Sequence, residues 1–378
     1  MKYGMFNYLV VCGFVVVSCA MAEGPSTVLN ADGQTPEPTV KIDNVCAWPN
    51  LTLLPDGTII ACIYNQPSHG RMVGDVDCYG STDQGVSWTK RGTVAPHEPG
   101  SLNNRMSRAV GLAHNGDLVA ICGGWTLREK APGEAGTGFD GPLDVDVLLR
   151  PWVCRSSDGG RNWEVDKKAF PTHSPDGGQF IVTGDVVRSD DGTLRVAAYG
   201  TRRDVKPRTY YAYILTSHDD GRTWEDPAAI DPELMLNETY LMNMGNGRYL
   251  ALARHDRLEV YQSTDHAKTW SHLTTATESK QIPGHLLRLK DGRLLLSYGD
   301  RTKGKEGVSV KVSTDGGMAW SASRRVVDFN GFDGGYPATV ELPGGIMFTA
   351  YYAKETTYHD RYHMGGVRWD LSTSLPLP

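Results

Sequence analysis

Arginine, tyrosine and glutamate side chains recur at the strand ends of a repeated pattern, where their chemistry could be combined. Guanidinium groups bind a carboxylate through two parallel hydrogen bonds, so a ring of such groups is suited to a small anionic sugar. Histidine transfers protons near neutral pH, which makes His69 and His97 further candidates for acid–base chemistry. Two repeats in the chain predict the elements that would bring these residues together.

The first repeat, here called the turn repeat, has the pattern Ser, any residue, Asp, any residue, Gly, two residues of any type, and Trp. It occurs at residues 81–88, 156–163, 217–224 and 313–320, and a fifth copy at 263–270 has Ala267 in place of the glycine. Aspartate accepts hydrogen bonds from the backbone of a tight turn, glycine adopts positive φ, and tryptophan packs a large apolar face beside the turn. The repeat therefore predicts structural turns rather than a site.

The second repeat consists of an apolar strand, a tight turn and another apolar strand. A turn repeat follows each of the first five copies, and residues 362–371 are predicted as a final strand after the sixth. Turns rich in Gly, Asn, Asp and Pro between β-rich flanks are hairpin signals. Six hairpins, each completed by outer strands, predict an all-β fold, a six-bladed β-propeller with almost no helix. The six copies span residues 48–64, 106–122, 180–199, 239–253, 286–298 and 336–352.

The strand order predicts which face of the propeller carries a site. If the first strand of each blade descends from the upper face, the hairpin turn and the turn repeat both lie at the lower face. The starts of the first strands and the ends of the second strands then converge at the upper face, around the central channel. The candidate substrate-binding residues at this face are Arg254, Arg301, Lys305, Arg105, Arg108 and Arg71.

The turn repeat resembles the Asp-box, or BNR, repeat of the sialidase (neuraminidase) superfamily, and its five copies cover most of the chain. The resemblance implies an exo-acting glycosidase that removes a terminal acidic sugar by a retaining Tyr/Glu mechanism. Tyr336, between Gly335 and Pro337, resembles the nucleophile of the superfamily, and Glu238 resembles the residue that activates it. Arg254 resembles one of three arginines that bind the substrate carboxylate. A phenol suits this task because it stays neutral beside an anionic sugar until a base takes its proton.

The arginine pattern of the superfamily is incomplete in this sequence. Ala47 stands where the first arginine is expected, and the third corresponds to Arg301 or Lys305. Arg105 or Arg108 on the second blade could replace the missing group. Losing one bidentate contact would weaken carboxylate binding, so the pocket could equally be adapted to another sugar.

The acid/base residue implied by the resemblance falls in the loop over residues 65–77, where Asp75 and His69 are both candidates. Two other functions remain open. One is a different carbohydrate-active enzyme on the same propeller, such as a hydrolase or lyase of rhamnose–glucuronate linkages with His69 or His97 as acid/base. The other is a glycan-binding propeller without catalysis, which the missing arginine favours.

Residues 1–22 have the composition of a signal peptide, with a basic start, an apolar run too short to span a bilayer and a small-x-small cleavage site. An alternative, lipobox-like processing site would leave Cys19 lipidated. Both predict an exported protein, which would be periplasmic, secreted or an outer-membrane lipoprotein. Residues 23–40 are then an extended lead-in, and residues 41–378 form the propeller.

The 378-residue chain has a formal net charge of −6, which gives no reason to expect a nucleic acid or an anionic membrane as a partner. We expect a monomer that acts on a glycan. Five cysteines follow the signal segment, and we expect most to be buried thiols, with a Cys46–Cys62 bond as one option. The sequence has no His-Glu-x-x-His and no Cys-x-x-Cys motif, so no metal or cofactor is predicted.

Overall fold

The computed structural model describes residues 26–131, 139 and 141–375, so the predicted signal segment and Cys19 lie outside the described residues. Within them the chain is almost entirely β, with one short 3-10 turn, η1 (Pro343–Gly345), and one single-turn helix, α1 (Leu371–Ser374). The prediction of an all-β fold is confirmed. None of the described helices is long and apolar enough to cross a membrane.

Three of the sheets are four-stranded, antiparallel and consecutive in the chain, and each begins with a predicted hairpin. The first contains β2 (Cys46–Leu53), β3 (Ile59–Tyr64), β4 (Val76–Ser81) and β5 (Thr89–Ala95). The second contains β15 (Thr239–Gly245), β16 (Arg248–Arg254), β17 (Leu258–Ser263) and β18 (Ser271–Thr275). The third contains β19 (Gln281–Arg288), β20 (Leu294–Asp300), β21 (Gly307–Ser313) and β22 (Arg324–Asp328).

A nine-stranded sheet holds two more antiparallel series. One is β6 (Asn103–Leu112), β7 (Leu118–Glu129), β9 (Trp152–Ser156) and β10 (Glu164–Asp166), with β8 (Leu143–Leu148) paired to the end of β7. The other is β11 (Gln179–Arg188), β12 (Leu194–Arg202), β13 (Thr209–Ser217) and β14 (Glu225–Ala229). The two series are joined where β6 and β11 run parallel, at Val110 and Asp185.

The remaining sheet combines both ends of the described chain. It contains β23 (Gly335–Glu341), β24 (Ile346–Ala353), β25 (His363–Asp370) and β1 (Thr39–Asp43). The predicted final strand is thus β25, but the outermost strand is β1, which begins within the predicted lead-in. Thr39 lies opposite Gly366 and Asp43 opposite His363.

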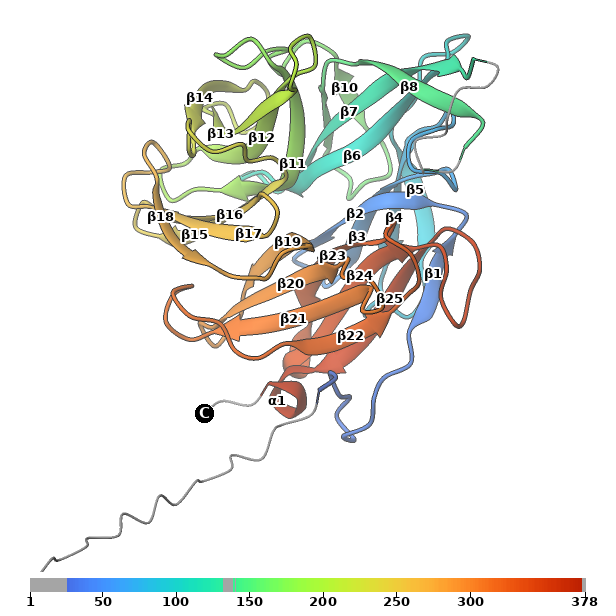
Figure 1. Ribbon diagram of the computed structural model, residues 1–378, viewed down its shortest axis with the longest axis vertical. Coiled ribbons are helices and arrows are strands. Elements are labelled where there is room, and N and C mark those ends of the chain that lie inside the picture. Colours follow the sequence, from blue (N-terminus) through green and yellow to red (C-terminus); the bar gives the residue numbers. More distant parts are fainter. Residues whose placement is uncertain (1–25, 132–138, 140, 376–378) are drawn as a thin grey trace, which may run out of the picture.

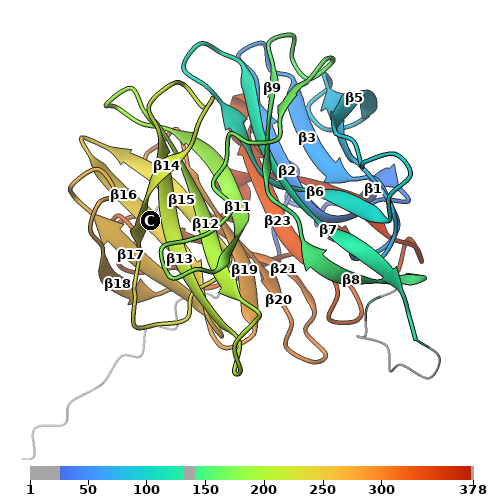
Figure 2. The ribbon, with the colours of Figure 1, turned by 90° about the horizontal axis from the view of Figure 1, so that it is seen from above.

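The first strands of the six series pack side by side and form a closed circle, in the order β2, β6, β11, β15, β19, β23 and back to β2. Figures 1 and 2 show the sheets arranged around this centre. Apolar side chains fill the space between neighbouring sheets, for example Ile59, Ala61 and Ile63 of β3 against Val340 and Phe348 of the last sheet. Their burial, at about 25 cal/mol per Å² of apolar surface, holds the sheets together.

The turn repeats form turns of one kind. In the second copy, Asp158 Oδ1 accepts hydrogen bonds from Ser156 Oγ at 2.8 Å and from the backbone N–H of Asn162 at 3.0 Å, while Gly160 N–H donates to Ser156 Oγ at 2.9 Å. The Ser–Asp and Ser–backbone contacts recur in the other four copies. Gly160 packs against Leu118, the first residue of β7, so the turn lies beside the hairpin turn as predicted.

The five described cysteines, Cys46, Cys62, Cys78, Cys122 and Cys154, are buried, and none of them forms a disulfide. The Cys46–Cys62 bond that the sequence left open does not form. In the β2–β3 pair Cys46 lies opposite Tyr64, whereas Cys62 lies opposite Asn50, so the two thiols are not cross-strand partners.

Candidate active site

Glu238 and Arg254 lie opposite each other at the open end of the β15–β16 hairpin. Glu238 directly precedes β15, Arg254 ends β16, and the N–H of Arg254 donates to the carbonyl of Glu238 at 3.2 Å. Their side chains form an ion pair in which Nη1 of Arg254 donates to Oε2 of Glu238. Burial would raise the pKa of Glu238, but Arg254, the Tyr336 hydroxyl and Arg301 together hold it below its ordinary value. The carboxylate is therefore ionised at neutral pH.

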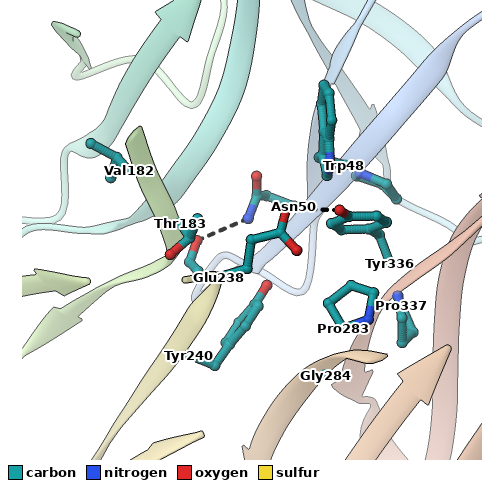
Figure 3. Close-up of a pocket in the computed structure, with 12 residues that line it drawn as sticks. Trp48, Asn50, Val182, Thr183, Glu238, Tyr240, Pro283, Gly284, Tyr336 and Pro337 are labelled. Carbon is teal, nitrogen blue, oxygen red and sulfur yellow. Dashed lines mark hydrogen bonds between the residues drawn. The ribbon is translucent and has the colours of Figure 1, made fainter. Parts of the chain in front are cut away.

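Tyr336 reaches this carboxylate from a bulge at the start of β23. Its φ is +49°, in the left-handed region that a tyrosine rarely adopts, and the β23–β24 register shifts between Gly335 and Ala338. Its hydroxyl donates to Glu238 Oε1 at 2.7 Å, and Figure 3 shows the phenol and the carboxylate facing each other. A backbone conformation of this kind costs of order 1–3 kcal/mol and persists where the surroundings impose it, often at functional sites.

The proton of this pair sits on the phenol. Burial raises the pKa of Tyr336, and the negative charge of Glu238 raises it further, while Arg254 and Arg301 act in the opposite direction. At neutral pH the tyrosine is therefore neutral and the glutamate is charged. This is the arrangement in which a carboxylate can accept the phenolic proton once the oxygen begins to form a bond.

A second guanidinium group lies beside the same phenol. Arg301 follows β20, and its Cζ lies 5.5 Å from the centroid of the Tyr336 ring. Lys305, the alternative that the sequence left open, is exposed four residues further along the loop. Arg254 and Arg301 thus both flank Tyr336, and the Nε atoms of both are buried without a hydrogen-bond partner among the described residues.

A pocket inside the circle of first strands leads to the Tyr336–Glu238 pair. Its floor includes Asn50, whose Nδ2 donates to the carbonyl of Gly184 at 3.0 Å (Figure 3). The bulges at the starts of β2, β19 and β23 each contain a proline, namely Pro49, Pro283 and Pro337. Proline is tolerated there because the bulge leaves its position without a strand partner. The side chains that line the pocket include Trp48, Asn50, Thr183, Glu238, Tyr240 and Tyr336.

The start of β2 contributes an aromatic wall instead of a cation. Ala47 and Trp48 have φ values of +62° and +54°, and the ring of Trp48 meets the Tyr336 ring edge-on with 5.9 Å between centroids. Ala47, which stands where the superfamily pattern has an arginine, is fully buried and packs with Tyr352 and Tyr362. No charged group reaches the pocket from this position.

The two candidate acid/base residues in the loop between β3 and β4 have different partners. Asp75 Oδ1 accepts from the backbone N–H of His97 at 2.7 Å and lies 2.6 Å from Nδ1 of the same histidine. His69 instead contacts Asp333 and meets Trp48 edge-on, with 4.8 Å between ring centroids. The structure therefore brings His69 next to the aromatic wall of the pocket, whereas Asp75 and His97 pair with each other.

The other predicted arginines lie elsewhere. The Cζ of Arg105 lies 3.4 Å from the Trp152 ring centroid, Nη1 donates to the carbonyl of Arg150 at 3.2 Å, and burial lowers the pKa of Arg105 to about 10. Arg71 is buried and its Nη1 pairs with Asp144 Oδ1 at 3.1 Å. Arg108 belongs to β6, and its side chain is not among those that the structure describes. Neither Arg105 nor Arg71 lines the pocket.

Asp333 is the principal residue of the site that had no predicted role. It lies three residues before Tyr336 and accepts hydrogen bonds from His69 Nδ1 at 2.8 Å, from the Tyr352 hydroxyl at 2.6 Å and from the Tyr362 hydroxyl. Burial would raise the pKa of Asp333, but these donors lower it to about 2. The only hint in the sequence is its place in the segment that leads into the last hairpin.

One group of three potential metal ligands occurs among the described residues. Ligand atoms of His218, Glu225 and Asp226 lie within 4.8 Å of one another, and all three side chains are exposed. The group sits at the turn repeat over residues 217–224, at the opposite end of the strands from the pocket. It has no contact with the Tyr336–Glu238 pair.

Comparison with known proteins agrees with this architecture. The model of the BNR repeat-like domain matches residues 73–349. A sialidase of Clostridium perfringens is 25% identical over 239 residues, which is 59% of this chain and 59% of that protein. A sialidase of Bacteroides fragilis is 24% identical over 334 residues, 78% of this chain and 58% of that protein. The chain thus spans less than two thirds of the length of these curated relatives.

Solved structures with the same fold include proteins with and without an assigned activity. A protein of unknown function from Dyadobacter fermentans superposes with a TM-score of 0.70 at 23% identity, over 88% of this chain and 98% of that chain. The Hadza microbial sialidase Hz136 superposes with a TM-score of 0.65 at 19% identity, over 88% of this chain and 66% of that chain. At these identities the likeness concerns the fold.

Proposed function

Because the chain belongs to the BNR repeat-like family within the sialidase-like superfamily, we propose that it is an exo-acting glycoside hydrolase that removes a terminal acidic sugar from glycans. The observation that carries the proposal is the hydrogen bond from the neutral Tyr336 hydroxyl to the ionised Glu238, at 2.7 Å. We further infer that the fold is a six-bladed propeller in which β6 and β11 join two blades. The closed circle of six first strands supports this inference.

In the proposed reaction the Tyr336 oxygen attacks the anomeric carbon while Glu238 takes its proton. The attacking group stays uncharged until the bond forms, which avoids repulsion by the carboxylate of the substrate. Arg254 Nη1 lies 3.3 Å from the attacking oxygen and Arg301 lies beside the Tyr336 ring, so both can bind that carboxylate and the charge that develops. Water then releases the sugar from Tyr336, and Glu238 returns the proton.

The pocket offers fewer cations than the superfamily pattern. Arg254 already pairs with Glu238, Ala47 supplies no charge, and Arg105 lies outside the pocket. The substrate carboxylate would therefore be held mainly by Arg301 and by the unused donors of Arg254. We propose a terminal sugar acid as the substrate class, with sialic acid and uronic acid caps as the two chemical types to compare.

The experiment that tests the proposal is sugar release from a panel of capped glycans. Wild type and Tyr336→Phe are incubated with sialyl-lactose and with rhamnose–glucuronate oligosaccharides. Phenylalanine keeps the ring packed against Trp48 and removes only the oxygen, so we expect release by wild type and a loss of at least ~10³-fold in the variant. A 2-fluoro sugar that traps the covalent intermediate should label Tyr336.

A second candidate function is a different carbohydrate-active enzyme on the same propeller, a hydrolase or lyase of rhamnose–glucuronate linkages. The burial of Ala47, together with the pairing of His69 with Asp333, favours it. Under this alternative Tyr336→Phe would be tolerated, and a lyase would release an unsaturated product that absorbs in the ultraviolet. Glycan binding without release by any variant would contradict both enzymatic proposals.

A further inference from the structure

We propose that the acid/base of this site is the imidazole of His69, held in position by Asp333, in place of a carboxylic acid. The inference rests on the proposed function, because it assigns the group that protonates the leaving oxygen of the glycoside. Asp333 does not touch the substrate in this scheme and acts as a positioning residue. Four features of the structure carry the assignment.

The first feature is the fixed orientation of the ring. Asp333 accepts from Nδ1 of His69 at 2.8 Å and is itself held by the hydroxyls of Tyr352 and Tyr362. A carboxylate that is ionised and fixed by three donors sets both the position and the tautomer of the imidazole. Nδ1 is thereby used, and Nε2 makes no hydrogen bond to any residue that the structure describes. His69 has one nitrogen left for a ligand.

The second feature is the position of His69 relative to the phenol of Tyr336. Trp48 meets both rings edge-on, at 4.8 Å from His69 and 5.9 Å from Tyr336. Tyr352 lies 6.2 Å from the His69 ring and 5.8 Å from the Tyr336 ring. The imidazole and the phenol therefore border the same two aromatic side chains, Trp48 and Tyr352.

The third feature is the packing of the imidazole. Phe139 stacks on it with 4.1 Å between ring centroids and an interplanar angle of 20°. Together with Trp48 this leaves 17% of the His69 side chain exposed. A proton donor that is shielded from water in this way transfers its proton to a bound ligand rather than to bulk solvent.

The fourth feature is the rigidity of the loop that carries His69. Gly70 has a φ of +71°, and a Cβ at this position would lie 2.0 Å from Cε of Met106. The carbonyl of Gly70 accepts from Asn104 Nδ2 at 2.8 Å, and Ser68 Oγ accepts from the N–H of Arg71 at 2.7 Å. The residues on either side of His69 are thus fixed by β6 and by the loop itself.

In the first half of the reaction, the imidazolium of His69 gives the proton on Nε2 to the glycosidic oxygen as the bond between that oxygen and the anomeric carbon breaks. The Tyr336 oxygen bonds to the same carbon, and Glu238 takes the phenolic proton. In the second half, neutral His69 takes a proton from water, whose oxygen replaces Tyr336 on the anomeric carbon. Glu238 returns its proton to Tyr336. The sum is hydrolysis, with no other reactant.

The experiment compares two leaving groups on the same acidic sugar, an alkyl glycoside that needs protonation and a 4-nitrophenyl glycoside that does not. For His69→Ala we expect kcat to fall at least ~100-fold on the alkyl glycoside and less than ~10-fold on the aryl glycoside, in line with the usual contribution of a general acid. Added imidazole should restore part of the alkyl rate. Asp333→Asn should show the same selective loss in kcat with little change in KM.

Two other histidines provide comparisons. His272→Ala is the matched control, because His272 also pairs with a carboxylate, that of Glu259 at 2.9 Å, but lies on the outer strands β17 and β18. We expect this variant to show no change in rate on either glycoside. Equal losses of His69→Ala on both glycosides would overturn the inference and leave the proposed function standing. A leaving-group-dependent loss in His97→Ala instead would also overturn it. Absence of turnover by wild type would overturn both proposals.

Discussion

Tyr336 and Glu238 form a 2.7 Å hydrogen bond although 98 residues separate them in the chain. They belong to different sheets, and β23 and β15 are not neighbours in the circle of first strands, since β19 lies between them. The contact therefore depends on how three successive sheets, those that begin with β15, β19 and β23, pack together. A change that loosens the packing between sheets should lower activity before the fold is lost, because it alters this distance first.

Replacing Glu238 by glutamine tests its role as the base. The amide cannot accept the phenolic proton, and Arg254 loses its charged partner. We expect kcat on an aryl glycoside to fall by roughly 10²–10⁴-fold with a smaller change in KM. Steady-state kinetics and a circular dichroism spectrum check this. A variant that keeps the wild-type kcat would rule out Glu238 as the base.

Arg301 and Lys305 compete for the place of a carboxylate-binding residue, and paired alanine variants distinguish them. Arg301 lies over Tyr336, whereas Lys305 is exposed on the loop. A charge-assisted hydrogen bond is worth about 1.5–3 kcal/mol, so Arg301→Ala should lower kcat/KM by roughly 10–150-fold. Lys305→Ala should stay within about twofold of wild type. The opposite ranking would contradict the arrangement proposed for the site.

Ala47→Arg tests whether the superfamily arginine can be restored. Ala47 is completely buried at a φ of +62° among Cys46, Tyr352 and Tyr362. A long charged side chain has no room there, so we expect the free energy of unfolding to fall by more than ~2 kcal/mol without a gain in activity. Urea unfolding measures the first and kinetics the second. A stable and more active variant would refute the view that this position serves only packing.

Asp185 should make stability depend on pH. Its Oδ1 is buried without a hydrogen-bond partner, and its Oδ2 lies 3.8 Å from Nε2 of the buried His285. Burial raises the pKa of Asp185 to about 7, against ~3.9 in an unfolded chain. The folded protein therefore holds this proton more tightly, and the resulting stabilisation is complete below about pH 4 and is lost as the pH rises through 7.

Asp185→Asn removes this titration while keeping the shape of the side chain. We expect the variant to match wild type below about pH 4 and to exceed it by roughly 1–3 kcal/mol at pH 8, measured as the free energy of unfolding in urea. The buried His285, whose Nε2 lies 3.8 Å from Asp185 Oδ2, also contributes to the pH dependence of stability. That histidine acts in the opposite direction, because burial lowers its pKa to about 3 and its stabilisation is lost as the pH falls. No difference at pH 8 would contradict the raised pKa.

The fold could be predicted because its signals are local. Each turn repeat specifies its own turn through an Asp and a Trp, and in four of the five copies a Gly, within eight residues. Each hairpin carries its own turn residues. The outermost strand of the last sheet could not be found in this way. β1 has five residues and pairs with β25 more than 300 residues later, so no pattern within a short window links the two.

Part of the site could be predicted, because the starts of first strands and the ends of second strands, which face the channel, can be located in the sequence. Glu238 and Arg254 are cross-strand partners, a relationship that follows from the hairpin register alone. Arg105 could not be assigned in the same way, because the bulge between Ser107 and Ala109 changes which face of β6 a side chain occupies. Asp333 lies in a loop, and its contacts with His69 come from a different sheet, which no spacing reveals.

The pairing of β1 with β25 also sets the order of events in folding. The earliest described strand, β1, has no partner in its sheet until β25 has been made. Contacts between residues so far apart in sequence slow folding, and until they form β25 presents an unpaired edge that can pair with other chains. We expect deletion of residues 39–43 to produce an aggregation-prone protein in which β25 keeps an unpaired edge and the other sheets form normally.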